Sequence, residues 1–508
     1  MTSHGTNPPG SSRAPAARPA VPPRRHATSN ATRLLCAGAY LDPVYRKAVI
    51  RELLTNWWRT VPPAYGYDTV SVLAHALAAD DLRRKQVRIV WAGSIAILVV
   101  AFSGGFGGYG IYSPLLILWL VWAAAVMRRV ATLQILATRL RPAQAAHDQG
   151  FDGSYPESPR LTAHRVATIA REQAAPGGRI LYGGYTPFVG AGAKMYQWSN
   201  AELLIGAPPN PLAQSVLRSG REGVQDEPAP DSAGARPEIK PFTVDELTDY
   251  VARRMAADLR DDPPAHERID ALVVERRKYG KVTGEMPAQA QIPAIEPIKV
   301  HWNDEYDASR EYLCVRVGSW QQELVTSVFV GFDVKGNTLH TEFCTYVLAP
   351  IVAGFHLVDR LPVELGGGLI ARIGWDALKG GPSALLPGGG AARKRVQAAP
   401  DHSEFQFGRY ARSVVDRGAR ASVRELAASG YHHFFQESDA DKYTRIVERR
   451  LLRIIEDFLV EHDVDLADHR ALQTNVLQQN FGDNNNLGSG TLNDNRSRPT
   501  PGRESHHD

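Results

Sequence analysis

The sequence predicts an α+β fold: N-terminal helices lead into a two-helix transmembrane hairpin, followed by a cytoplasmic antiparallel-sheet domain and C-terminal amphipathic helices. Residues 89–127 form a run of 39 positions without Asp, Glu, Lys, Arg or His. Residues 324–334 alternate in polarity with the period of a strand, and Lys335-Gly336-Asn337 separates them from a second strand-like segment. Residues 438–458 place apolar side chains at helical spacing.

The uncharged run divides into two arms at the glycine-rich residues 104–110. Each arm, with a few flanking residues, approaches the ~20 apolar residues that span a bilayer. A buried helical hairpin in a soluble core is the alternative interpretation. Because core helices seldom lose every charge over this length, the run favours two membrane spans.

Cations flank the run on both sides and are absent from its centre. Residues 1–150 carry 17 Lys/Arg and 6 Asp/Glu, so the basic part of the chain adjoins the hairpin. Cytoplasmic flanks of membrane spans are enriched in Lys and Arg, which predicts a two-pass protein of the cell membrane with both termini in the cytoplasm. Basic flanks also attract anionic lipid. The residues expected to contact the bilayer surface are Arg83, Arg84, Lys85, Arg88, Arg128 and Arg129. Nucleic acid is not an expected partner, because no aromatic-interleaved basic motif is present.

The N-terminal region is predicted to be helical from residue 31. Residues 1–30 are rich in Pro, Ser and Ala and are expected to form a disordered tail. In residues 31–88, Asp42-Pro43 and Asp68 are good helix starts. The helix after Asp68 should run directly into the first arm, and residues 128–150 should extend the second arm as a helix.

Residues 151–365 are predicted to form the cytoplasmic α+β domain, with a flexible linker at 208–241. Thr243 and Glu246 have capping-box spacing and should open a helix. Strands are expected at 179–185, 193–205, 269–278, 311–317, 324–334 and 338–348. Because Val328, Val330 and Phe332 alternate with smaller or polar residues, the strand that contains them should be half-buried.

The C-terminal region is predicted to be a loop-rich linker at 366–402, a helical segment at 403–480 and a disordered Asn-rich tail at 481–508. Ser438 should cap an amphipathic helix. The apolar stripe of that helix comprises Tyr443, Val447, Leu451, Ile454, Ile455 and Phe458.

The candidate ligand-binding residues surround a glycine-rich turn between two strands. They are Gly183, Gly184, Gly190, Gly192 and Lys194. Glycine amides beside a lysine can hold a phosphate. A P-loop, however, needs Ser or Thr after its lysine and then a helix, whereas Met195 and a strand follow here. A structural turn is the alternative, and it is the simpler interpretation.

Other polar clusters give weaker signals. His340 and Glu342 share a strand face and could form an acid/base pair, but no catalytic residue is predicted, because neither a nucleophile nor a known hydrolase or kinase motif accompanies them. Residues 301–307 and 462–469 contain metal-ligand residue types without zinc or EF-hand spacing. The three cysteines lack CxxC spacing. No metal and no cofactor is therefore expected.

Several segments occur in an order that resembles a group of uncharacterised two-span membrane proteins of high-GC Gram-positive bacteria. They are RLLCAGAYLDPVYRKAVIRELL at 33–54, PPAYGYD at 62–68, the two-arm hairpin, YGGYTPFVGAG at 182–192 and the terminal helix before the Asn-rich tail. The resemblance covers most of the chain. It implies a shared architecture and no established activity.

The function is not determined by these patterns, and three hypotheses remain. The first is a membrane-tethered cytoplasmic binding or scaffolding protein whose protein partner is unknown. The second is a membrane-anchored enzyme with a site between the glycine-rich turn and the His340/Glu342 strand. The third is an oligomeric membrane-perturbing effector whose hairpins pack through Gly93, Ser94 and residues 123–125.

Overall fold

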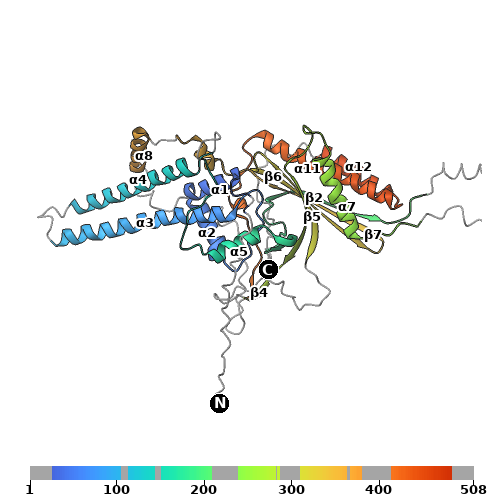
Figure 1. Ribbon diagram of the computed structural model, residues 1–508, viewed down its shortest axis with the longest axis horizontal. Coiled ribbons are helices and arrows are strands. Elements are labelled where there is room, and N and C mark those ends of the chain that lie inside the picture. Colours follow the sequence, from blue (N-terminus) through green and yellow to red (C-terminus); the bar gives the residue numbers. More distant parts are fainter. Residues whose placement is uncertain are drawn as a thin grey trace, which may run out of the picture.

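The computed structural model describes residues 24, 26–103, 112–142, 150–208, 238–281, 283–285, 309–362, 366–379 and 414–482. Figure 1 shows a long helical hairpin projecting from a bundle of short helices, and a sheet with helices packed against it on the opposite side of that bundle. The predicted tails at 1–30 and 481–508 and the linker at 208–241 lie almost wholly outside the described residues.

The hairpin consists of α3 (Thr69–Phe102) and α4 (Ser113–Arg139). Asp68 caps α3 by accepting from the amide of Ser71, and α3 continues unbroken from the helical bundle into the apolar run, as predicted. The predicted helical extension of the second arm is present only in part, because α4 ends at Arg139 and residues 140–142 are not helical. Both helices are long and apolar enough to cross a membrane.

The apolar surface of the hairpin faces away from the rest of the described chain. Only 6% of the most apolar window of α3 and 11% of that of α4 is buried. Trp91 and Trp119 remain 67% and 62% exposed. The two helices contact each other where Gly93 faces Leu120, at a distance that leaves no room for a larger side chain. A helix pair in a soluble core would instead be mostly covered.

The helical bundle comprises α1 (Asn30–Leu41), α2 (Pro43–Ile50), a π-turn at Arg51–Thr55 and α5 (Ala163–Gln173), packed around the start of α3. Asp42 accepts from the amide of Val44 with Pro43 in the first turn, which confirms the predicted helix start. Gly38 lies against the ring of Phe355, from the short helix η5 (Ala353–Arg360) that follows the sheet. Val423, in α10 (Val423–Leu426), joins the same core. The hairpin is therefore continuous with a core that later segments of the chain complete.

The main sheet has the strand order β1-β3-β5-β6-β7-β2. Its pairings are antiparallel except that β1 lies parallel to β3, so the prediction of a purely antiparallel sheet is wrong at this edge. The two strands on either side of the glycine-rich turn, β1 and β2, occupy opposite edges. The strands are β1 (Arg179–Tyr182), β2 (Ala193–Leu203), β3 (Leu272–Lys281), β5 (Arg310–Ser319), β6 (Leu324–Lys335) and β7 (Thr338–Leu348).

Three helices cover one face of the sheet: α7 (Val244–Ala256), α11 (Phe434–Glu461) and α12 (Ala467–Gly482) (Figure 1). The capping box of Thr243 and Glu246 is confirmed. The predicted stripe of α11 packs against the sheet. Its predicted start at Ser438 is five residues too late, because His433 is the N-cap and the side chain of Gln436 accepts from the amide of His433.

Strand β6 differs from the predicted half-buried pattern. Residues 324–331 are buried on both faces, and exposure alternates only over the last four residues. The second face is covered by Phe188, which stacks on Phe329 with ring centroids 4.1 Å apart. When helices cover one face of a strand and a loop covers the other, buried and exposed side chains no longer alternate along it.

The remaining elements are short and correct two sequence predictions. Helix α8 (Gly367–Lys379) lies in the segment predicted to be a loop-rich linker. Strand β8 (Val414–Asp416) lies in the segment predicted to be helical, and it pairs with β4 (Thr283–Glu285). Two further turns, η3 (Pro176–Gly178) and η4 (Ala257–Asp261), lead into β1 and follow α7.

Candidate functional site

The amides of the glycine-rich turn are bonded to carboxylates of the chain itself. Gly184 donates to Asp416 Oδ2 at 2.7 Å. Gly190 and Gly192 both donate to Glu425 Oε1, at 2.9 and 3.0 Å. The turn is thus an anion-binding arrangement whose anion is an internal side chain.

Glu425 is held on both of its oxygens. Its other oxygen, Oε2, accepts from the amide of Ser422 at 2.7 Å within a capping box. Burial raises the pKa of the Glu425 carboxyl, and the backbone donors partly offset this effect. Lys194 lies exposed at the start of β2, opposite Tyr346. The predicted ligand loop therefore fastens β1 and β2 to Asp416 at the end of β8 and to Glu425 in α10.

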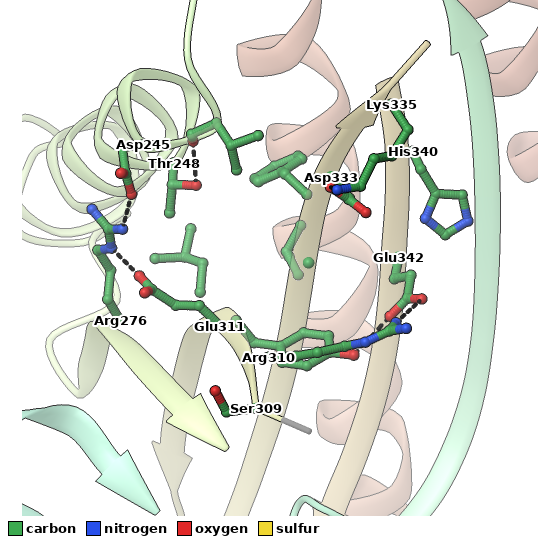
Figure 2. Close-up of a pocket in the computed structure, with 16 residues that line it drawn as sticks. Asp245, Thr248, Arg276, Ser309, Arg310, Glu311, Asp333, Lys335, His340 and Glu342 are labelled. Carbon is green, nitrogen blue, oxygen red and sulfur yellow. Dashed lines mark hydrogen bonds and ion pairs between the residues drawn. The ribbon is translucent and has the colours of Figure 1, made fainter. Parts of the chain in front are cut away.

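A charged recess lies where β5 begins, at one end of the sheet and beside α7. Its volume is about 520 Å³. Figure 2 shows two charged groups on opposite sides of it, one around Arg276 and one around Glu342. The ionisable side chains that line it are Asp245, Arg276, Arg310, Glu311, Tyr312, Asp333, Lys335, His340 and Glu342.

The first group surrounds the guanidinium of Arg276 in β3. Arg276 pairs with Asp245 and Glu311, which lie with it on one side of the recess (Figure 2), and with Asp249 at 2.8 Å. Burial opposes the charge, but these carboxylates outweigh it and raise the pKa of Arg276. Two neighbouring strands, β3 and β5, and the helix α7 are thereby joined through a fixed cation.

The second group is centred on Glu342 in β7. Its Oε2 accepts from the Tyr312 hydroxyl at 2.7 Å and its Oε1 lies 3.2 Å from Arg310 Nη1. The register places Tyr312 two strands from Glu342, with Gly331 between them on β6. A Cβ at Gly331 would lie 2.8 Å from the Tyr312 ring, so only glycine lets the ring cross this strand. Burial and the Glu342 carboxylate raise the pKa of the phenol.

A family model for the AbeC-like domain matches residues 197–493, which is more than half of the 508-residue chain. This chain belongs to the AbeC-like domain family. No curated protein and no solved structure matches the chain. The AbeC-like domain contains β2, β3, β5, β6, β7 and the helices that cover them, and it therefore includes the whole charged recess. The two apolar helices precede the matched residues.

The predicted His340/Glu342 pair is the part of the sequence analysis that coincides with the recess of the AbeC-like domain. Both side chains line it, but Glu342 is bonded to Tyr312 and Arg310. None of the described lining residues comes from the glycine-rich turn, so the two halves of the hypothetical enzyme site do not meet. Arg310 and Tyr312 were missed as site residues. Arg310 and Tyr312 are two residues apart on β5, and this spacing indicates that they share a face of the sheet. The spacing does not identify Glu342 on β7 as their partner.

The other predicted clusters have structural partners or are not described. Residues 301–307 lie outside the described residues. His462 bonds to the carbonyl of Phe458, and His469 is buried against Glu202. Within the described parts of the chain, no three His, Cys, Asp or Glu side chains are arranged to hold a metal. His432 and His433 precede α11, although the segment at 403–480 that contains them was predicted to be helical.

Proposed function

We propose that this chain is a two-pass membrane protein that holds its AbeC-like domain at the cytoplasmic surface, where the charged recess binds a segment of a protein partner. The proposal depends on the presence of two features in one chain. They are an apolar hairpin that the rest of the described chain leaves uncovered, and a preformed recess in the folded domain that is lined by charges of both signs. The first feature supports attachment, and the second supports recognition.

Membrane insertion is supported by the direction in which the apolar side chains point. Trp91, Val99 and Leu115 are all more than half exposed, and no other described part of the chain covers them. Water-exposed apolar surface costs about 25 cal/mol per Å², so a bilayer is the environment that stabilises this surface. Basic residues beside the apolar run favour an orientation with both termini in the cytoplasm.

The attachment supports a fixed distance between membrane and domain. Helix α3 is buried in the helical bundle from Thr69 to Leu77 and becomes fully apolar at Ile89. The same helix continues from Ala79 to Ile89, and this segment spans about 15 Å at 1.5 Å per residue. The core of the helical bundle also contains residues that follow the sheet in the chain. The domain is therefore connected to the hairpin through this folded core.

The recess supports binding of a segment that carries both signs of charge. Its lining combines Arg276, Arg310 and Lys335 with Asp245, Glu311, Asp333 and Glu342. A polyanion such as nucleic acid would meet four carboxylates, which disfavours it. A peptide with a basic and an acidic side chain can replace internal ion pairs on both sides of the recess.

Topology tests the first part of this proposal. A reporter fused after residue 60 and a reporter fused after residue 300 should both be active in the cytoplasm, because charged flanks stay behind when the apolar arms insert. A tag placed in residues 104–110 should be reachable from outside. If the fusion at residue 300 reports on the outer side, only one arm spans, and the recess is not cytoplasmic.

Photo-crosslinking from the recess tests the second part. A photoreactive residue at His340 in the full-length protein should give a discrete crosslinked product in cells. The product should be lost when Arg310→Gln and Glu342→Gln are combined. Val460, exposed on α11, provides the control position. Products that are equal from both positions, or that are unaffected by the double substitution, would exclude the recess as a binding site.

A further inference from the structure

Arg46 is a buried cation at the junction of α2 with the hairpin. Its side chain is only 3% exposed. Nη1 donates to the carbonyl of Ala39 at 3.2 Å. Nε and Nη2 are buried and have no hydrogen-bond partner among the described residues. A guanidinium in this state carries a desolvation cost that one neutral acceptor does not offset.

The charges around Arg46 include two further arginines, one from each hairpin helix. Burial lowers the pKa of Arg46, and the nearby charges of Arg83 and Arg128 lower it further. Arg128 also has a buried Nε without a partner among the described residues, and its electrostatic neighbours are Arg83 and Arg129. Three helices thus bring their cations within electrostatic range of one another.

The acids that face this junction are already engaged. Asp80 pairs with Arg84 at 2.9 Å and with Arg160 at 2.8 Å. Asp42 caps α2 by accepting from the amide of Val44 at 2.8 Å. Both carboxylates favour the charged form of Arg46, but neither is hydrogen-bonded to it, and two carboxylates do not balance three arginines, so the junction retains an excess of positive charge. An external anion with several acceptor oxygens would satisfy the unpartnered nitrogens.

The junction lies at the end of the apolar run. Arg128 directly follows the last residue of that run, Met127. The contact of Gly93 with Leu120 sets the antiparallel register of the hairpin, and this register places Arg128 at the level of Lys85. In the proposed orientation this is the depth of the cytoplasmic lipid headgroups.

We propose that the junction of α2, α3 and α4 is a binding site for the phosphate group of an anionic phospholipid, held by Arg46, Arg83 and Arg128. The site rests on the proposed membrane insertion. Arginine forks match phosphate oxygens, and Arg46 Nε and Nη2 with Arg128 Nε are the unpartnered donors. These nitrogens are covered in the structure, so phosphate binding requires the half-buried Arg128 side chain to move aside. Arg46 lies outside the apolar helices and their basic flanks. A lipid that Arg46 holds is therefore bound at a defined site, in addition to the general attraction of the flanks for anionic lipid.

The test uses the full-length protein in nanodiscs of phosphatidylcholine, with and without phosphatidylglycerol. The wild type should retain phosphatidylglycerol through purification, detected by native mass spectrometry, and its midpoint of thermal unfolding should rise when that lipid is present. Arg46→Gln should lower lipid retention at least about tenfold and abolish the rise. Lys47→Gln, an exposed neighbour on the same helix, is the matched control and should behave like the wild type.

A stability measurement separates binding from folding. In lipid-free detergent, Arg46→Gln should unfold at or above the wild-type temperature, because it removes a buried charge that two arginines repel. A lower temperature there would indicate a purely structural role and overturn the site. Stabilisation by inorganic phosphate alone, with no preference for phosphatidylglycerol, would assign a soluble phosphate and contradict the lipid. Membrane fractionation of the cells that express each variant distinguishes either outcome from a failure of membrane insertion.

Discussion

The imidazole of His469 and the carboxylate of Glu202 form a buried pair in which Nδ1 lies 3.1 Å from Oε1. The other ring nitrogen, Nε2, lies 2.8 Å from the carbonyl oxygen of Leu452. Because both partners accept hydrogen bonds, both nitrogens donate and the ring is positively charged. Glu202 belongs to β2, His469 to α12 and Leu452 to α11. The pair therefore fastens the last described helix to the edge of the sheet.

Replacing His469 by Gln should destabilise the protein in a pH-dependent way. Breaking a buried pair costs about 3–5 kcal/mol. Burial lowers the pKa of His469, but the Glu202 hydrogen bond outweighs it, so the folded pKa is raised. The stabilisation should be complete below about pH 6.5, the unfolded pKa, and should disappear as pH rises through the raised folded value. Thermal unfolding across this range measures the difference, with exposed His266→Gln as control. A pH-independent difference would contradict a charged ring.

His356 should give a second pH-dependent contribution, at the boundary between sheet and helical bundle. Its Nδ1 lies 3.2 Å from Asp359 and its Nε2 lies 3.0 Å from Glu323, and these contacts raise its pKa to about 9. Because the ring is partly exposed, His356→Gln should cost about 1 kcal/mol. The cost should be present below about pH 6.5 and should fade as pH rises through about 9. Unfolding midpoints of the variant and the wild type that run parallel to pH 10 would refute this assignment.

Two glycines of the same turn should respond very differently to alanine. Gly192 has a φ of +92° and a Cβ there would lie 2.2 Å from the carbonyl oxygen of Val347. Gly184 has a φ of +78° with no atom within 4 Å of such a Cβ. Gly184→Ala should therefore cost about 1–2 kcal/mol from backbone strain, and Gly192→Ala more than about 4 kcal/mol, because the turn must also move away from β7. Chemical denaturation of both variants in detergent gives the comparison. Equal losses would mean that β2 and the turn tolerate displacement.

Features encoded within a few residues could be predicted from the sequence. The caps at Asp42, Asp68 and Thr243 depend on side-chain to backbone bonds inside one turn, and each is present. The β6–β7 pairing depends on the short turn at Gly336 and Asn337 and is also present. Helix α8 was not predicted, because the glycine-rich sequence on both sides of it indicated a loop and its apolar periodicity is weak.

Features that depend on distant segments could not be predicted in this way. The parallel pairing of β1 with β3 joins residues almost a hundred positions apart. Glu425 fills the glycine-rich turn from more than 230 positions away, so the turn alone looked like a ligand loop. In the recess, His340 and Glu342 were grouped because they are two apart on one strand. Tyr312 and Arg310 reach Glu342 only through the register of three strands.

Gly331→Ala should impair the recess without removing any charge. A Cβ at this position would lie 2.8 Å from the Tyr312 ring, so the ring must shift and its hydroxyl must leave Glu342. The overpacking should cost about 1–3 kcal/mol, which leaves the fold in place. We expect the crosslinked product from His340 to fall as far as it does in Glu342→Gln. Tyr312→Phe, which keeps the ring and removes one hydrogen bond, should reduce it less.

Gly354→Ala is the matched control for that experiment, since a Cβ there would meet no atom within 4 Å. It should leave both the unfolding midpoint and the crosslinked product at the wild-type level. If Gly331→Ala also leaves the product unchanged while Glu342→Gln removes it, the charge of Glu342 acts independently of its orientation. The Tyr312 ring would then be part of the core alone, and the geometric account of the recess would be wrong.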